Sequence, residues 1–321
     1  MIYNKILEQI KKVKSVAIFS HINSDADAIG SSIALKLALE NMGKKVTIFI
    51  DEPIHSNFEF MNTQKHLNQH KNDHFELAIC LDCPNPKRFG TNIKYFYRIK
   101  NTINIDHHPD NEKFALINLV DDKSCSTSSI IYKFLSHLSI EINQEMATCL
   151  YAGIAGDTGR FKHNNTTSED MLIASKLLDL GADLETINYY LFARMSQNEF
   201  SLLKLALNKT EFYSDNRFAL ICLDINDFIK TDCQPNDAHF LIDYLLNLIG
   251  TKIAVVMSQE KSEEFKVSIR SRDDYSAQNV AKSFGGGGHI RASGCRIFSN
   301  ISKAKKQIID AVMQEDKRCT E

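Results

Sequence analysis

Residues 16–31 read VAIFSHINSDADAIGS, a short apolar run that passes through a polar loop into a helix-like stretch. The apolar start is typical of a buried strand, and we expect the helix over 30–42, closed by Gly43. The chain then repeats this alternation, with further strand-like runs at 46–50, 77–81 and 102–105. Strands that alternate with helices predict an α/β fold, a mainly parallel sheet with helices on both faces.

The second half of the chain has a different pattern. It is helix-like over 168–207 and then contains strand-like and helical stretches at 217–223, 238–249, 253–257 and 265–270. A short helix, a glycine run and an amphipathic helix at 301–312 follow. We predict a first α/β domain over 1–190 that carries the functional site, a helical linker over 191–212, and a second, smaller α/β domain over 213–321.

The 321 residues are 43% apolar and 24% charged, with a formal net charge of −2. A protein that grips long nucleic acid through its phosphates is usually far more basic, so any nucleotide ligand should be short or held by a local positive patch. The N-terminus reads as an amphipathic helix rather than a signal peptide, and no apolar run approaches the roughly 20 residues that cross a bilayer. We expect a cytoplasmic protein without a membrane partner.

The polar loop of the opening stretch holds His21, Asp25 and Asp27 within one turn. Two carboxylates this close repel each other unless they are protonated or neutralised by a cation. A divalent metal ion would relieve the repulsion, and mixed histidine and aspartate ligation suits Mn²⁺ or a similar ion. The alternative is a solvated loop that caps the following helix.

Two further polar motifs follow strand-like runs. Asp82 comes directly after 77–81 and, taken alone, is better explained as a turn or cap residue. Asp106, His107 and His108 follow 102–105. Neighbouring residues of an extended chain point opposite ways, so we expect one histidine to ligate metal, the other to face substrate, and the aspartate to orient an imidazole. The alternative is a polar turn stopped by the following proline.

A fourth motif lies at the end of a helical run, where Gly153, Gly156 and Gly159 surround Asp157. Small residues would let the backbone approach a ligand closely, and the carboxylate offers a further metal ligand. Arg160 could meet a phosphate or form a surface ion pair. Because ligand sites in parallel sheets lie beyond the carboxyl ends of the strands, we expect the four motifs to meet there.

The second domain contains a glycine run followed by cationic residues. Its backbone N–H groups could cradle an anion, but it lacks the Lys-Ser/Thr of a P-loop. A flexible linker is the alternative, although the neighbouring cationic residues favour contact with phosphate or nucleotide. The residues concerned are Arg270, Arg272, Gly286, Gly287, Gly288, His289 and Arg291.

The eight cysteines are scattered, and several lie inside apolar runs, which fits reduced thiols in a cytosolic chain. Cys80 and Cys83 form a C-x-x-C motif, yet no second pair follows at the spacing of a structural zinc site. We favour a structural role for this pair over zinc binding or redox chemistry.

Together these motifs resemble the DHH phosphoesterase superfamily, through His-x-x-x-Asp-x-Asp-Ala-x-Gly-Ser from His21, the strand-end Asp82, Asp106-His107-His108, and Gly-x-x-x-Asp-Thr-Gly around Asp157. The glycine–histidine tail resembles the DHHA1 domain of one branch. The resemblance covers essentially the whole chain and is greatest to the nanoRNA exonuclease (oligoribonuclease)/pAp phosphatase group. It implies a hydrolase that cuts very short oligoribonucleotides to mononucleotides and pAp to AMP.

The resemblance also implies two divalent metal ions, usually Mn²⁺, and a role for each residue. One ion would be held by His21 and Asp25, the other by Asp27, His107 and Asp157. Asp82 would bridge the ions, and His108 would contact the scissile phosphate with Asp106 beside it. Arg270, the glycine loop and His289 would hold the far end of the substrate. Two cations roughly 3.5–4 Å apart clamp an in-line displacement, in which a bridging hydroxide attacks phosphorus.

Two positions depart from the family pattern. Cys83 stands where relatives often carry serine or threonine, and Ser129 where they often carry glutamate. Both leave substrate preference open. A cyclic di-AMP or pApA phosphodiesterase is the alternative within this chemistry, and a non-catalytic nucleotide-binding regulatory protein is the alternative of another class. The expected partner is short RNA or a small nucleotide, and the sequence leaves open whether the chain forms a homodimer.

Overall fold

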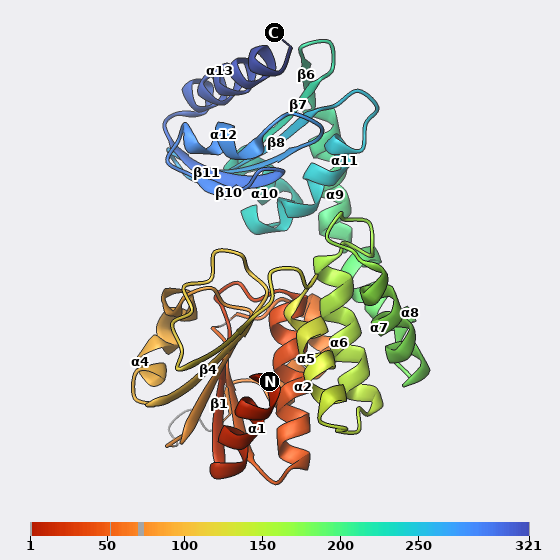
Figure 1. Cartoon of the computed structure of the whole chain (residues 1–321). Helices are drawn as coiled ribbons and strands as arrows, with labels where there is room; N and C mark the ends of the chain where they lie inside the picture. The colour runs from red at the N-terminus through yellow and green to blue at the C-terminus, as the bar shows by residue number, and fades with distance from the viewer. Residues whose placement is uncertain (1, 52, 70–73, 321) are drawn as a thin grey trace. The chain divides into compact units, whose positions relative to one another are not determined.

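The computed structural model describes residues 2–51, 53–69 and 74–320. The chain divides into two compact units, the first ending at Arg194 and the second starting at Met195. Figure 1 shows a sheet flanked by helices in each of them. The predicted α/β fold with a second, smaller α/β domain is confirmed.

The first unit is built on a five-stranded sheet in the order β2-β1-β3-β4-β5, whose neighbouring strands are all parallel. The strands are β1 Ser15–Phe19, β2 Lys45–Phe49, β3 Leu77–Leu81, β4 Asn101–Asp106 and β5 Ile117–Val120. The α-helices are α1 Ile2–Lys12, α2 Ala26–Asn41, α3 Thr63–His66, α4 Ile93–Phe96, α5 Thr127–His137, α6 Gln144–Asp157, α7 Ser168–Asp179 and α8 Leu184–Asn188. Two 3-10 helices, η1 Ser56–Met61 and η2 Pro86–Asn92, and a π-helix, η3 Tyr189–Ala193, complete the unit.

Both faces of this sheet are covered, which explains the nearly continuous apolar runs of its strands. Successive residues of a strand point to opposite faces, so in β1 Ile18 enters one core and Phe19 the other. The first core is largely aliphatic and includes residues of α2, α5 and α6, which lie together on one side of the sheet in Figure 1. The second core is rich in aromatic residues, and Phe19 stacks there on Phe49 with ring centroids 4.7 Å apart.

The helix after β1 begins earlier than the expected residue 30. α2 starts at Ala26 because the side chain of Asp25 accepts hydrogen bonds from the backbone N–H groups of Asp27 and Ala28. Part of the predicted polar loop is therefore the first turn of a helix. Asp27 lies in that turn and is fully buried.

Helices α2, α5 and α6 approach one another closely, and glycine makes this possible. A Cβ on Gly30 of α2 would collide with the carbonyl oxygen of Cys149 in α6. A Cβ on Gly153 of α6 would collide with Ser128 Oγ at the start of α5. The absence of these two side chains lets the start of α5 reach the first turn of α2.

The second unit contains a six-stranded mixed sheet in the order β10-β11-β9-β8-β7-β6, in which β7 and β8 are parallel and the other pairs are antiparallel. The strands are β6 Glu211–Tyr213, β7 Phe218–Leu223, β8 Ile253–Lys261, β9 Glu264–Ser271, β10 Gly287–His289 and β11 Ala292–Phe298. The helices are α9 Gln197–Asn208, α10 Ile225–Thr231, η4 Pro235–Phe240, α11 Leu241–Leu246, α12 Ala277–Lys282 and α13 Ile301–Thr320.

Two helical stretches differ from their predictions. The pattern over 168–207 is interrupted by Gly181, which adopts a left-handed conformation (φ 88°) after α7, and its last part, α9, lies in the second unit. The stretch over 238–249 begins as the 3-10 helix η4, which carries Pro235 at its start, and ends at Leu246. Periodicity marks apolar faces, but it does not locate the breaks between short helices.

Helices cover the two faces of the second sheet unequally. On one face, buried residues of α12 and α13 pack against β7, β8, β9 and β11. On the other face, α9, α10 and α11 pack against β7 and β8 to form a second core. Among residues 195–320, no residue of β9 or β11 belongs to this second core. The second face of β9 and β11 is thus left outside the helix-covered core.

Within the described residues, no helix combines the length and apolar character that a bilayer crossing needs. All eight cysteines are free thiols. Cys80 and Cys83 are buried in the aromatic core, and neither belongs to a group of potential metal ligands in the described part of the chain.

An ion pair joins α13 to Arg217, the residue before β7, in the second unit. Asp316 is 6% exposed and accepts hydrogen bonds from Arg217 Nε and Nη2, each at 3.0 Å, and from the Tyr275 hydroxyl at 2.8 Å. The contact with Arg217 is the main reason that the pKa of Asp316 is lowered.

We expect Asp316→Asn to lower the free energy of unfolding by about 1–3 kcal/mol at neutral pH, because Arg217 loses its charged partner. The folded pKa lies below the unfolded one, so the contribution is present above about pH 4 and is lost as pH falls through the folded pKa. Thermal melts of the full chain across this range measure it. Asp310→Asn, an exposed change on the same helix, should leave the melting temperature unchanged, and equal melts of the two variants would contradict the prediction.

Candidate metal centre

Three strands of the first sheet end in the predicted polar motifs. His21 follows β1, Asp82 follows β3, and Asp106-His107-His108 ends β4. Because the strands are parallel neighbours, their carboxyl ends meet at one edge of the sheet. The expectation that these side chains gather there is confirmed by the distances between them.

Asp82 is the centre of the cluster. It is 2% exposed and adopts a left-handed backbone conformation (φ 52°) directly after β3. Its Oδ2 lies 3.3 Å from His21 Nε2, and its Oδ1 lies 3.4 Å from His107 Nε2. The two oxygens of one buried carboxylate therefore face imidazoles from two different strands.

The first group of potential metal ligands comprises His21, Asp25 and Asp82. His21 Nδ1 lies 2.7 Å from the carbonyl oxygen of Ile22, a contact that leaves Nε2 free to act as a ligand. Asp25 uses Oδ1 to cap α2, while its Oδ2 lies 3.8 Å from His21 Nε2. His21 and Asp25 thus each have one atom held by the backbone and one directed into the group.

The second group comprises Asp27, His107 and Asp157. His107 Nε2 lies 3.2 Å from Asp157 Oδ2 at the end of α6. Asp27 receives hydrogen bonds from the backbone N–H groups of Thr127 and Ser128, at 2.7 and 2.8 Å, where α5 begins. A helix N-terminus stabilises a carboxylate in this position.

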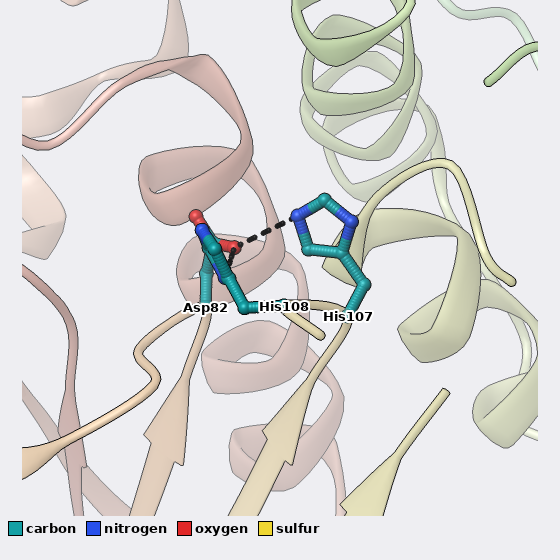
Figure 2. Close-up of side chains that lie close together, drawn as sticks. All are labelled: Asp82, His107 and His108. Carbon is teal, nitrogen blue, oxygen red and sulfur yellow. Dashed lines mark ion pairs between the residues drawn. The ribbon is translucent and has the colours of Figure 1, made fainter. Parts of the chain in front are cut away.

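His108 belongs to a third group with Asp82 and His107 (Figure 2). Both imidazoles approach Asp82 Oδ1, so the prediction that they point to opposite sides is wrong. The reason is that β4 ends at Asp106, and the alternation of an extended strand does not continue beyond it. Their other contacts differ, since His108 Nδ1 lies 2.8 Å from Asp106 Oδ1 and His107 contacts Asp157.

Asp106 is fully buried and receives three contacts. Its Oδ1 accepts a hydrogen bond from the backbone N–H of His107 and lies against His108 Nδ1, and its Oδ2 accepts one from Asn111 Nδ2 at 2.5 Å. The carboxylate is held on both oxygens and so fixes the orientation of the His108 ring. Asn111 was not identified from the sequence, because nothing in the spacing indicates that it folds back on Asp106.

The acidic groups of the cluster perturb one another. Burial and the carboxylate of Asp82 raise the pKa of Asp27 well above its usual range. Burial, partly offset by His107, raises the pKa of Asp157 to about 6. Burial disfavours the ionised form of Asp82, but hydrogen bonds from His107 and His21 hold the pKa of Asp82 well below its usual range.

The pKa of His107 is raised as well, for a different reason. Burial disfavours its charged form, yet its contacts with Asp157 and Asp82 raise the pKa of His107 to about 12. A proton on this imidazole neutralises negative charge that a bound cation would neutralise instead.

The residues fit divalent cations. The first and second groups each offer one imidazole nitrogen and two carboxylate oxygens within 4.8 Å of one another, the donor chemistry that suits Mn²⁺ or a similar ion. Gly153 opens the space behind Asp27, since a Cβ there would lie 2.6 Å from Asp27 Oδ1. Ser128 Oγ, which the same Cβ would strike, is buried and has no hydrogen-bond partner among the described residues.

The predicted substrate-binding residues of the second unit are only partly brought together. The register pairs His289 with Ala292 and Ala292 with Arg270, so the three side chains share one face of the sheet. This is the face of β9 and β11 outside the helix-covered core. Two other predicted residues have contacts elsewhere, since Arg272 Nη2 donates to Asn247 Oδ1 and Arg291 Nη1 to the carbonyl oxygen of Tyr275.

The glycine run is part of the sheet rather than a flexible linker. Gly287 and Gly288 lie in β10 and pair with β11. A Cβ on Gly286 would collide with the carbonyl oxygen of Gly294, and Gly288 has a φ of 133°. Glycine is required here by close backbone approach and by backbone conformation.

Arg160 lies in the first unit, three residues beyond Asp157. It is exposed, and its guanidinium lies over the ring of Phe192, 4.9 Å from the centroid. The contact is a cation–π interaction, and the predicted phosphate contact of Arg160 stays a prediction.

Comparisons with known proteins agree with this arrangement. Residues 15–154 match the DHH family, N-terminal domain, and residues 219–315 match the DHHA1 domain. The bifunctional oligoribonuclease and PAP phosphatase NrnA of Thermus thermophilus is 30% identical over 313 residues, 97% of this chain and 93% of the relative. The protein of the same name from Bacillus subtilis is 25% identical over 300 residues, 92% of this chain and 93% of the relative. The solved structure of an exopolyphosphatase-related protein from Bacteroides fragilis superposes with a TM-score of 0.92 at 25% identity, covering 100% of this chain and 98% of that one.

Proposed function

This chain belongs to the DHH phosphoesterase family, in the branch whose second domain is DHHA1, and we propose that it hydrolyses very short oligoribonucleotides to mononucleotides and pAp to AMP. The proposal is supported by the names of its relatives in Thermus thermophilus and Bacillus subtilis. The observation that carries it is the position of Asp82 between two groups of metal ligands. The cytoplasmic location and a homodimer stay predictions.

The family depends on divalent metal, and we propose two Mn²⁺ ions. His21 and Asp25 would hold one, Asp27, His107 and Asp157 the other, and Asp82 would contribute one oxygen to each. Bound ions would neutralise the carboxylates and supply Lewis acidity to water and the phosphoryl group. The support for this division is that the two groups have no residue in common, while Asp82 of the first group lies 3.4 Å from His107 of the second.

The chain's own residues would orient the reacting groups. Asp106 holds His108 by Nδ1, which directs the other ring nitrogen, Nε2, away from that carboxylate and makes it available to a phosphoryl oxygen. The raised pKa of His108, which burial opposes and Asp106 promotes, keeps a proton available there. No serine or cysteine nucleophile is needed.

The second unit would contribute residues that bind phosphate or nucleotide. Arg270 and His289 share a sheet face with the small residue Ala292 between them, an arrangement that can receive a phosphate or nucleotide. With a formal net charge of −2, the chain lacks the general positive charge that a long nucleic acid requires. The proposed substrates are therefore short.

A substrate panel tests the proposal. Purified protein with Mn²⁺ is given pAp, a short oligoribonucleotide, pApA, cyclic di-AMP and a long RNA, and kcat/KM is measured for each. We expect the highest kcat/KM values for pAp and the short RNA. Faster turnover of cyclic di-AMP would replace the proposal with the phosphodiesterase alternative. Nucleotide binding without metal uptake or turnover would favour the regulatory alternative.

Metal removal should abolish the activity. After treatment with a chelator and desalting, we expect turnover of pAp to fall to background and to return on addition of Mn²⁺, because the buried carboxylates need the ions to bind an anionic substrate. A protein incubated identically without chelator is the control. Full activity in metal-depleted protein, verified by elemental analysis, would reject a metal-dependent mechanism.

Arg270→Gln should weaken substrate binding. The loss of a charged hydrogen bond costs about 1.5–3 kcal/mol, so we expect KM to rise about 10–100-fold while kcat changes little. Arg296→Gln is the matched control, because Arg296 lies on the same sheet face but pairs with Glu260 and Glu264. Equal KM values for the two variants would remove Arg270 from the binding site.

A further inference from the structure

Thr127, the first residue of α5, contacts both halves of the candidate metal centre. Its hydroxyl donates to Asp82 Oδ1 at 3.2 Å, and its backbone N–H donates to Asp27 Oδ2 at 2.7 Å. The residue is fully buried, so its hydroxyl cannot exchange this partner for water. Thr127 lies 45 positions from Asp82 and 100 from Asp27, and these separations give no indication of the contacts.

The orientation of the Asp82 carboxylate requires such a contact. The torsion that turns a carboxylate is broad, and rotation would exchange or misplace its oxygens at little cost. Oδ2 faces His21 Nε2, whereas Oδ1 is approached by His107 Nε2 and by the Thr127 hydroxyl. Imidazoles that bind metal ions can no longer hydrogen-bond to the carboxylate through the same nitrogen. The hydroxyl can keep its contact when the imidazoles turn to metal.

The start of α5 is itself fixed. Ser126 caps the helix by accepting a hydrogen bond from the backbone N–H of Ser129, at 3.1 Å. The β-branched side chain of Thr127 has few rotamers, so a fixed backbone fixes the direction of its hydroxyl.

We propose that Thr127 is a positioning residue that holds the Asp82 carboxylate with one oxygen toward each group of metal ligands. It is not among the proposed metal ligands and acts through Asp82 and Asp27. The inference rests on the proposed two-metal function and adds to it a residue outside the ligand set.

The test compares Thr127→Val, which keeps the shape but removes the hydroxyl, with Thr127→Ser, which restores it. Mn²⁺ binding to the full-length protein is measured by calorimetry, and coupling between the two ions by electron paramagnetic resonance. We expect Thr127→Val to weaken binding of one Mn²⁺ about 10–100-fold, as loss of a residue that orients a ligand does, and to reduce the spin-coupled signal. We expect kcat for pAp to fall with little change in KM, and Thr127→Ser to recover most of each loss.

Ser129→Ala is the matched control. Ser129 is also buried near the start of α5, but its hydroxyl donates to Asp170, which lies outside the metal groups. It should change stability without changing Mn²⁺ affinity. If Thr127→Val fails to fold, Thr127→Cys, with a thiol that is only a weak donor, takes its place under the same criteria.

Each outcome bears on one of the two ideas. Two Mn²⁺ ions bound with wild-type affinity and coupling by Thr127→Val would overturn the role of Thr127 and leave the proposed function intact. The same loss in Ser129→Ala would also overturn it, because a general weakening of α5 would then be the cause. A wild-type protein that binds no Mn²⁺ would overturn the proposed function, and the inference with it.

Discussion

Asp82→Asn is expected to lower kcat/KM for pAp at least about a thousandfold, the equivalent of the several kcal/mol that metal ions contribute to phosphoryl transfer. Asn keeps the shape of the side chain but removes the charge, and its amide nitrogen would point at His21 or His107, which lie 3.3 and 3.4 Å from the present oxygens. Both proposed metal ions would lose a ligand. Steady-state kinetics and metal analysis of the same preparation measure the effect.

Asp179→Asn is the control for this experiment, because Asp179 is an exposed aspartate at the end of α7, in the same unit. It should retain wild-type activity and metal content. An Asp82→Asn protein that binds two ions and turns over pAp at the wild-type rate would contradict the assignment of Asp82 as the shared ligand.

Gly153→Ala is expected to damage fold and site together. The added methyl group would collide with Ser128 Oγ and lie 2.6 Å from Asp27 Oδ1, so α6 must move away from α5 or Asp27 must turn. Overpacking of this kind costs about 1–3 kcal/mol. We expect a lower melting temperature and weaker Mn²⁺ binding, measured by thermal melts with and without metal.

Gly156→Ala offers a control on the same helix. Its added Cβ would meet only the side chain of Ala26, at 3.0 Å, so a small shift accommodates it. Alanine also favours the helix relative to glycine. If both variants melt and bind metal alike, close packing at Gly153 does not position Asp27.

The chemistry-bearing residues could largely be recognised from the sequence. His21, Asp82 and Asp106-His107-His108 follow apolar runs that the structure shows as parallel strands β1, β3 and β4. Parallel strands end at one edge, so residues distant in sequence were correctly expected together. The directions of the two histidine side chains were not predicted correctly, because the chain leaves the extended conformation after Asp106.

The contacts that hold the ligands could not be predicted. Asn111 on Asp106, and Thr127 and Ser128 on Asp27, are common polar residues with no motif to distinguish them. Their partners are decided by where helices and loops pack, and packing depends on side-chain volumes rather than on spacing. The role of the glycine run could not be predicted either, since its composition allowed a flexible linker and its pairing with β11 excludes one.

The sequence by itself therefore determined the α/β architecture and the residues capable of binding metal, since strand periodicity and residue chemistry are local properties of the chain. Only the tertiary structure decided how the metal-binding residues are arranged, with Asp82 between two groups of ligands and the start of α5 donating a hydrogen bond to Asp27. That arrangement depends on the close approach of α2, α5 and α6 at Gly30 and Gly153. A hydrogen bond between residues 100 positions apart exists only once those helices have packed.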